Sequence, residues 1–277
     1  MKNTNRTKTK LDLATLLGLM LAFGGIIGGL LLEGGRIQDV SQLTGALIVL
    51  GGTIGAVMVT TPTYLLMGAV RKLKYVFFQP SYSPGTTVEQ IIVLANKARR
   101  NGLVSLEPDV EAIEDPFMRK ALALGVDGTD LEDIRQIMEV EIDVAESRGR
   151  AEARVYDAAG GYAPTIGIIG AVLGLIQVMK HLDNIELVGH GIAVAFVATV
   201  YGVALANLLF IPAGQKLKAR VENETLMKEL TLEGICAVIQ GLNPKVIEQK
   251  LEAYDKQYQP RHRSMTASRP MGKGMAA

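Results

Sequence analysis

Four long apolar segments dominate the pattern of hydrophobic and polar positions along this chain. None of them contains an Asp, Glu, Lys or Arg, and they cover residues 13–32, 43–70, 158–179 and 187–215. A helix of about 20 apolar residues is long enough to cross the hydrocarbon core of a bilayer. The pattern therefore predicts an all-α integral membrane protein with four transmembrane helices.

The connections between these segments alternate in length. Short loops follow the first and third segments, which predicts two helical hairpins, and a long charged stretch lies between the hairpins. We expect transmembrane helices at residues 11–32, 43–70 (with a cytoplasmic extension), 158–180 and 190–213, joined by short loops at 33–42 and 181–189. The remaining expected parts are an N-terminus at 1–10, a large helical insertion at 71–157, a helical tail at 214–259 and a basic, disordered tail at 260–277.

Basic residues predict the orientation of the hairpins. Lysines and arginines gather before the first segment, after the second and after the fourth, while the short loops hold very few. Because cytoplasmic loops of membrane proteins are enriched in Lys and Arg, both termini and the insertion are expected in the cytoplasm. A cleaved signal peptide is the less favoured interpretation of residues 13–32, since the apolar run is long and no A-x-A site closes it.

Amphipathic spacing predicts that the insertion and the tail are helical. Apolar positions recur with the helical period in residues 88–100 and 131–153. The pair Asn101-Gly102 is suited to end the first of these helices, and Asn243-Pro244 is expected to break the tail.

Composition and charge exclude several functions. The formal net charge is +1, so the chain has no excess positive charge with which to bind nucleic acid. Its single cysteine, Cys236, permits neither an internal disulfide nor a cysteine-based metal site, and we expect it to be buried as a small hydrophobe. Motifs for nucleotides, metals or hydrolytic nucleophiles are missing from the sequence, so neither a cofactor nor enzymatic activity is expected.

Small residues recur at helical spacing in the third and fourth segments. Each helix thereby gains a smooth side on which another helix can approach closely. The residues are Gly167, Gly170 and Gly174 in the third segment, and Ala195 and Gly202 in the fourth. Two interpretations stay open: the two segments pack on each other, or they accept a helix from a partner.

Two prolines mark the expected cytoplasmic edge of the membrane. Pro164 lies near the start of the third segment and Pro212 near the end of the fourth. A proline removes a backbone hydrogen bond and weakens the helix locally. The pair therefore either ends the two helices or forms two hinges at one depth.

An ionisable group is missing from the interior of the four segments. Ion and proton pathways normally place such a group within the membrane, and His190, at the outer end of the fourth segment, is better suited to an interfacial role. If the protein moves protons, the titrating carboxylate must come from a partner. Thr165 and Thr199 are the best-placed hydroxyls, although a helical threonine often bonds its own backbone instead.

Three motifs are specific when they are taken together. They are ARRNGLVSLE at residues 98–107, APTIGIIGAVLGLI at 163–176 and GHGIAVAFVATVYGVALANLLFIP at 189–212. With the two hairpins and the insertion, they resemble the MotA family of flagellar motor stator proteins, over the whole chain except its last, basic tail. The resemblance implies an ion channel subunit of the bacterial inner membrane that serves flagellar motility and chemotaxis.

The resemblance also implies partners. Members of the family are understood to form a ring of five subunits around two copies of MotB, each of which donates one transmembrane helix with an essential aspartate. That helix supplies the missing carboxylate and packs on the smooth sides of the third and fourth segments. Ion flow is thought to rotate the ring and to drive the rotor protein FliG.

Roles of particular residues follow from the same resemblance. The family's rotor-contacting arginine and glutamate match Arg99 and Glu107, for which a plain solvated helix face is the alternative. The family's paired prolines match Pro164 and Pro212, as points of conformational coupling.

The expected lining of the ion path indicates which ion is carried. The resemblance assigns to this lining Thr165, Ala171, Ala198 and Thr199. Sodium-type relatives carry a threonine at the position of Ala171 and a Thr-Thr pair at residues 198–199. Sodium requires several oxygen ligands and alanine side chains offer none, so protons are expected.

Two other functions are alternatives to this interpretation. A channel subunit like ExbB or TolQ is the nearest alternative, but those relatives have three spans and an external N-terminus. A self-sufficient secondary transporter predicts an intramembrane charge or paired broken helices, and the first of these is missing from the four segments.

Overall fold

The structure is a computed structural model that describes residues 10–79 and 84–258. The expectations for the first nine residues and for the basic tail at 260–277 lie outside the described residues. The chain divides into two compact units, which are described separately below. The first unit comprises Met1–Ser81 and Glu146–Val221, and the second comprises Tyr82–Ala145 and Glu222–Ala277.

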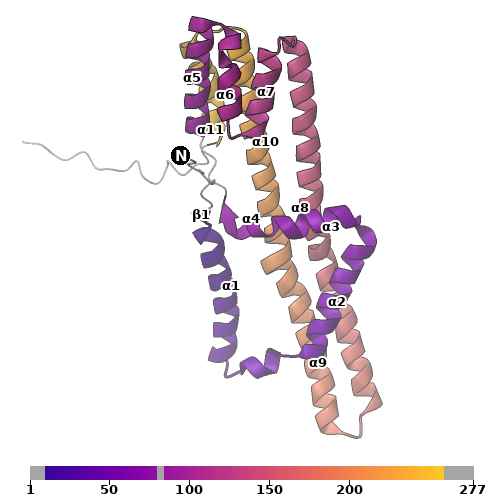
Figure 1. Ribbon diagram of the computed structural model, residues 1–277. Helices are drawn as coiled ribbons and strands as arrows, with labels where there is room; N and C mark the ends of the chain where they lie inside the picture. Colours follow the sequence, from indigo (N-terminus) through magenta and orange to yellow (C-terminus); the bar gives the residue numbers. More distant parts are fainter. Residues whose placement is uncertain (1–9, 80–83, 259–277) are drawn as a thin grey trace, which may run out of the picture. The chain divides into compact units, whose positions relative to one another are not determined.

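Four helical stretches are long and apolar enough to cross a membrane. They are Leu13–Leu32, Ile37–Thr60, Leu131–Lys180 and Ile185–Ile239. Figure 1 shows the corresponding helices α1 (Leu13–Leu32), α2 (Leu43–Thr60), α8 (Leu131–Lys180) and α9 (Ile185–Ala204). The predicted helical class and the four apolar segments are therefore confirmed.

The second apolar segment ends earlier than the sequence pattern predicts. A helix was expected through residue 70, but α2 stops at Thr60 and a separate helix, α3 (Thr63–Lys72), follows. Thr61 is extended, with φ −125° and ψ 129°. Pro62 explains the break, because a proline disfavours the helical conformation of the residue before it. The short helix α4 (Lys74–Phe77) continues from α3.

The two long helices run further than expected. The amphipathic helix predicted at 131–153 and the third transmembrane segment form one helix, α8, which has 50 residues and contains Pro164. At 1.5 Å per residue it is about 75 Å long. Helix α9 passes through a π-helical segment, Leu205–Phe210, into α10 (Ile211–Ile239).

A small sheet is the departure from an all-helical fold in the described part. Strands β1 (Lys10–Leu11) and β2 (Phe78–Gln79) pair antiparallel, with Lys10 opposite Gln79. The short 3-10 helix η1 (Ile37–Val40) lies between α1 and α2. Both features belong to the first unit.

The second unit is a compact helical bundle. Its elements are α5 (Pro84–Asn101), η2 (Leu103–Leu106), α6 (Glu107–Ala112), α7 (Pro116–Val126), α11 (Pro244–Tyr258), the beginning of α8 and the end of α10. Side chains from all parts of this bundle meet in one core, which includes Ile91, Leu106, Met118, Ile134, Ile235 and Leu251. Cys236 is 1% exposed within this core, as expected. The expected helix ends at Asn101 and before Pro244 are confirmed.

Candidate functional site

Helices α8 and α9 pack against each other through their small residues. A Cβ atom at Gly174 would lie 2.8 Å from the Ala195 backbone nitrogen, and a Cβ atom at Gly202 would lie 3.1 Å from Gly167 Cα. Real Cβ atoms rarely approach that closely, so the two backbones require glycine at these points. The mutual packing that the sequence left open as one interpretation is the contact observed.

Helix α2 packs on the same pair of helices. A Cβ atom at Gly45 would lie 3.5 Å from the Ala198 backbone nitrogen, and one at Gly170 would lie 3.4 Å from Ile48 Cγ2. The small residues assigned to a partner helix are buried by these contacts; they are Gly167, Gly170, Gly174, Ala195 and Gly202. A partner helix must therefore use the exposed positions beside them.

The four residues expected along the ion path do not form one polar site in the chain. The Thr199 hydroxyl donates to the Ala195 carbonyl at 3.1 Å, and the Thr165 hydroxyl donates to the Tyr162 carbonyl at 2.8 Å. Both threonines thus bond their own helix, which is the alternative considered from the sequence. Ala198 is fully buried against Gly170, and Ala171 is half-buried.

A shallow groove lies beside Thr199. Its volume is about 380 Å³, and it is lined by Ile26 of α1 and by Thr199, Val200, Val203, Ala204, Asn207 and Leu208. Asn207 lies in the π-helical segment, and its side-chain amide donates to the Val203 carbonyl at 2.9 Å. Sequence analysis missed Asn207, although it is the one amide side chain between Leu187 and Pro212. The groove therefore has two polar side chains in an otherwise apolar lining.

The prolines do not end their helices. Pro164 lies inside α8, and Pro212 is the second residue of α10, within a helical run that begins at Ile185. A Cβ atom at Gly202 would lie 3.2 Å from Pro164 Cα, whereas Ile211 packs on Gly160. The two prolines therefore do not lie directly opposite each other in this pair of helices.

The π-helical segment ends at Phe210, two residues before Pro212. A proline inside a helix removes one hydrogen bond and crowds the carbonyl four residues earlier. A π-bulge widens the helix locally and re-routes its hydrogen bonds, and such bulges are frequent at functional sites. The segment Leu205–Phe210 therefore marks where the helix accommodates Pro212.

Tyr201 is a second residue that sequence analysis missed. Its hydroxyl accepts from the Gln42 backbone N–H at 3.2 Å and donates to the Val40 carbonyl. These two backbone groups lie where η1 gives way to α2, outside any regular ladder. An unsatisfied backbone group in an apolar environment costs several kcal/mol, so the Tyr201 hydroxyl stabilises this connection.

A buried carboxylate joins α3 to α8. Glu152 is 3% exposed and pairs with Lys72 at 2.8 Å and with Arg148 at 3.2 Å. A Cβ atom at Gly68 would collide with the Glu152 side chain, so a glycine is needed opposite it. The pair with Arg148 is visible in the local sequence as an i,i+4 spacing, but the pair with Lys72, eighty residues earlier, is not.

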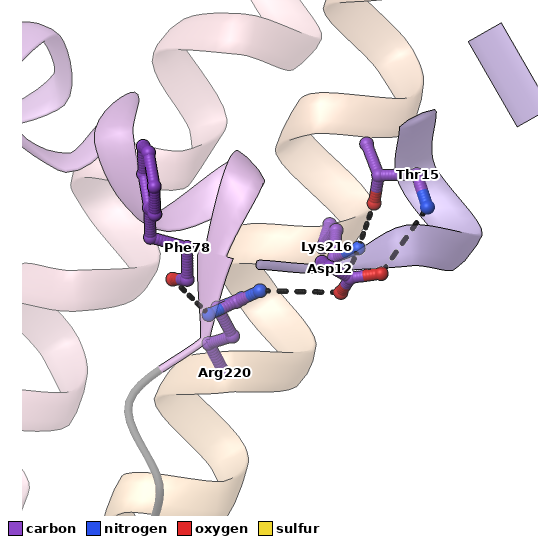
Figure 2. Close-up of polar contacts among 5 residues, drawn as sticks. All are labelled: Asp12, Thr15, Phe78, Lys216 and Arg220. Atoms are coloured by element: carbon purple, nitrogen blue, oxygen red, sulfur yellow. Dashed lines mark hydrogen bonds and ion pairs between the residues drawn. The ribbon is translucent and has the colours of Figure 1, made fainter. Parts of the chain in front are cut away.

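A polar cluster holds the N-terminal end of α1 (Figure 2). Asp12 caps the helix by accepting from the Thr15 backbone N–H at 3.1 Å. Lys216 of α10 forms an ion pair with Asp12, and Arg220 lies 3.4 Å from the same carboxylate while donating to the Phe78 carbonyl at 2.8 Å. Because α1 buries none of its own residues, this cluster is a principal attachment of α1 to the first unit.

Arg99 and Glu107 flank one connection in the second unit. Arg99 is exposed near the end of α5, and Glu107 is exposed at the start of α6. Gly102 turns the chain between them with φ 84°, a conformation that favours glycine, and Leu106 anchors the connection at 0% exposure. Among residues 10–79 and 84–258, neither charge has an ion-pair partner, so both are available to another molecule.

A charged cluster braces the second unit. Glu233 of α10 lies 3.1 Å from Arg135 of α8 and pairs with Lys250 of α11. Burial favours a raised pKa for the Glu233 carboxyl, but hydrogen bonds from Lys250 and Arg135 outweigh it and hold that pKa below its ordinary value of 4.5. Elsewhere in the described chain, no three His, Cys, Asp or Glu side chains gather as metal ligands do.

Comparison with known proteins shows two matching families. Residues 109–230 match the MotA/TolQ/ExbB proton channel family, and residues 16–102 match the motility protein A N-terminal family. Motility protein A of Bacillus subtilis is 37% identical to this chain, over 88% of this chain and 91% of that relative.

Solved structures show the same likeness. The chain superimposes on MotAB of C. jejuni with a TM-score of 0.84 and 36% identity, covering 88% of this chain and 96% of that one. For the flagellar MotAB stator complex of Bacillus subtilis the TM-score is 0.80 and the identity 37%, covering 89% and 98%. Two family matches that together include the apolar helices and the helical bundle, and full-length relatives above 30% identity, place this chain in the motility protein A branch of the MotA/TolQ/ExbB proton channel family.

Proposed function

We propose that this chain is the ion-conducting subunit of a bacterial flagellar stator and that it works with a MotB-like partner. The observation that carries the proposal is a set of four apolar segments, in a member of this family, that contain no Asp, Glu, Lys or Arg and lie in helices long enough to cross a membrane. A proton path through a membrane needs a titratable group. A single-span partner with an intramembrane aspartate supplies that group, and the likeness to two MotAB complexes supports such a partner.

Protons are the ion that the chemistry of the apolar helices favours. Sodium must exchange its water shell for several oxygen ligands. The Thr165 and Thr199 hydroxyls already bond their own helices, and Ala171 and Ala198 offer no oxygen. Along these helices a proton requires only the partner's carboxylate and water.

The proposed arrangement has the apolar helices as two hairpins in the inner membrane. Lysines and arginines flank the ends that this arrangement places inside the cell, which supports cytoplasmic termini and a cytoplasmic insertion. In this proposal five copies surround two partner helices. The exposed apolar surface of α8 and α9, which includes Ile168, Val172 and Phe196, is the surface available to those helices and to other copies.

Arg99 and Glu107 are the proposed contacts with the rotor protein FliG. Their exposure and their lack of ion-pair partners in the described chain support this role. Pro164 and Pro212 are the proposed points at which a change at the partner's carboxylate alters the helices. The weakened helix at Pro164 and the π-helical segment before Pro212 support local bending there.

The match to the motility protein A N-terminal family distinguishes this function from that of an ExbB- or TolQ-like subunit. That match covers residues 16–102, and thus α1, α2, α3 and α5. The general channel family alone matches only from residue 109 onward.

Reconstitution in lipid vesicles tests the proposal. The full chain alone is expected to conduct almost no ions, because it has no intramembrane acid of its own. Co-reconstitution with a MotB-like partner is expected to produce proton flux that persists in sodium-free buffer. The partner's Asp→Asn variant is expected to abolish that flux.

Two results contradict different parts of the proposal. Selective conduction by the chain alone refutes the need for a partner's carboxylate. Flux that requires the partner but stops when sodium is removed at constant proton-motive force refutes protons as the ion. It does not contradict the need for a partner.

A further inference from the structure

Helices α3 and α4 carry an outward face that combines apolar and basic side chains. Tyr64, Met67, Arg71 and Lys74 follow one another at intervals of three, four and three residues, which places them on one side of a helix. Tyr64 is 64% exposed and Met67 53% exposed. Val70, beside this stripe, is 70% exposed. We call these five residues the outward face.

The opposite side of α3 is fixed to α8, so the rotation of the outward face is determined. Lys72 reaches inward to Glu152 at 2.8 Å, and the Tyr156 hydroxyl donates to the Ala69 carbonyl at 2.8 Å. Gly68 permits the close approach to Glu152. Ala69 is 2% exposed, which confirms that this side is the buried one.

The two cations of the outward face have no carboxylate partner in the described chain. A guanidinium nitrogen of Arg71 lies 3.7 Å from the Met67 sulfur, and the Lys74 amine lies 5.0 Å from the centre of its neighbour Tyr75. The neighbouring Lys72 is neutralised by Glu152. Of these three basic residues, Lys72 therefore pairs within the fold, whereas Arg71 and Lys74 face outward.

The outward face lies at the end of an apolar helix. Helix α2 ends at Thr60, and α3 begins at Thr63. Figure 1 shows α3 and α4 running crosswise to α2. A helix that turns across the end of a transmembrane segment lies along the boundary between hydrocarbon and water.

We propose that the outward face of α3 and α4 lies in the head-group layer and binds anionic phospholipid through Arg71 and Lys74. Helices with apolar side chains on one face and cations beside them lie in this layer, where the apolar groups enter the acyl boundary. The cations then meet phosphate groups, and basic residues next to a membrane attract anionic lipids. Tyr64 fits the same layer, since tyrosine is enriched at membrane interfaces.

Fluorescence quenching by brominated lipids tests this inference, because the chain contains no tryptophan. A Val70→Trp variant of the full chain places one reporter on the outward face. It is reconstituted with brominated phosphatidylglycerol or with brominated phosphatidylcholine. Quenching is expected to show a several-fold preference for phosphatidylglycerol, and adding both Arg71→Gln and Lys74→Gln is expected to reduce it to nearly equal quenching by the two lipids.

Matched controls separate recognition from net charge. Arg100→Gln with Lys245→Gln removes the same two charges from exposed positions of the second unit, and the lipid preference is expected to stay unchanged. Equal quenching by both lipids in the Val70→Trp variant overturns the proposal. Quenching by neither lipid also overturns it, because the face is then covered by another copy or another protein.

Discussion

At the residue scale, the buried charges are matched by partners that the local sequence does not show. Glu152 meets Lys72, and Glu233 meets Arg135 and Lys250, from distant parts of the chain. Sequence analysis identified Arg99 and Glu107 because they belong to a motif that resembles one of a known family, and both side chains are exposed in the structure. It missed Asp12, Glu152 and Tyr201, because their importance depends on contacts that only the folded chain creates.

Glu233→Gln is expected to lower the melting temperature of the full chain in detergent at pH 7. The pKa of Glu233 is depressed in the folded chain, so its contribution to stability is complete above about pH 5 and is lost as pH falls through the folded-state pKa. Loss of charge-assisted hydrogen bonds at a side chain that is 14% exposed costs about 2 kcal/mol. The difference between the variant and the parent is therefore expected to shrink below about pH 4.5.

Glu139→Gln is the control for this measurement. Glu139 is 55% exposed and lies 3.8 Å from the same Arg135, so it removes an equal charge from a weak surface pair. The melting temperature of this variant is expected to stay close to that of the parent. A pH-independent loss of stability in Glu233→Gln contradicts an origin in the carboxylate charge.

At the element scale, the positions of the apolar segments could be predicted from the sequence. Whether each segment forms one unbroken helix could not. The first helix begins and ends where the uncharged run does, at Leu13 and Leu32. The sequence predicted a single helix across Pro62, where the structure has a break, and it left helix termination open at Pro164 and Pro212, where the structure has none. Pro62 is exposed beside the break, whereas Pro164 lies where α8 is packed against α9. A proline in the sequence therefore does not by itself show whether a helix ends there.

Gly202→Ala is expected to lower the melting temperature of the full chain. A Cβ atom at this position would lie 2.5 Å from the Ala163 carbonyl oxygen and 3.1 Å from Gly167 Cα. Overpacking of this kind costs about 1–3 kcal/mol, which outweighs the gain in helix propensity of about 1 kcal/mol. Thermal unfolding monitored by circular dichroism measures the change.

Gly51→Ala is the matched control in α2. No atom lies within 4 Å of a Cβ built at Gly51, so the substitution meets open space within the chain. Its melting temperature is expected to equal or exceed that of the parent. Equal stability of the Gly202 variant and the parent means that α8 and α9 separate more easily than the contacts indicate.

At the scale of the whole molecule, the fold class and the family could be predicted from the sequence because both depend on patterns. Charge-free stretches of membrane length and three motifs needed no knowledge of contacts. The candidate ion path could be predicted only in part. Small residues at helical spacing predict that another helix approaches closely, but they do not show whether that helix belongs to the same chain or to a partner. In the structure, the approaching helix belongs to the same chain.

Arg99→Glu and Glu107→Arg are each expected to abolish or strongly impair swimming while the chain still assembles in the membrane. Both side chains are exposed, so the substitutions are expected to change stability by less than about 0.5 kcal/mol. Proton flux in vesicles with a MotB-like partner is expected to stay at the parent's level, because neither residue belongs to the apolar helices. Motility assays and flux measurements on the same variants check both expectations.

Normal swimming by both variants rules out a rotor contact at these positions. Loss of flux together with loss of swimming assigns Arg99 and Glu107 to assembly or conduction instead. Exposed Lys245, changed to Glu, is the control for a general effect of charge on the second unit.

Helix α1 buries none of its own residues, and the polar cluster at Asp12 attaches its N-terminal end to the first unit. In most helices of a folded protein, other side chains of the protein cover the apolar residues. In α1, the surrounding hydrocarbon covers them instead. The bilayer is in that sense a missing part of the tertiary structure. Extraction into detergent consequently replaces the lipid around the apolar helices with detergent. We expect α1 to be the helix whose stability changes most, because its apolar side chains have the least contact with the rest of the chain.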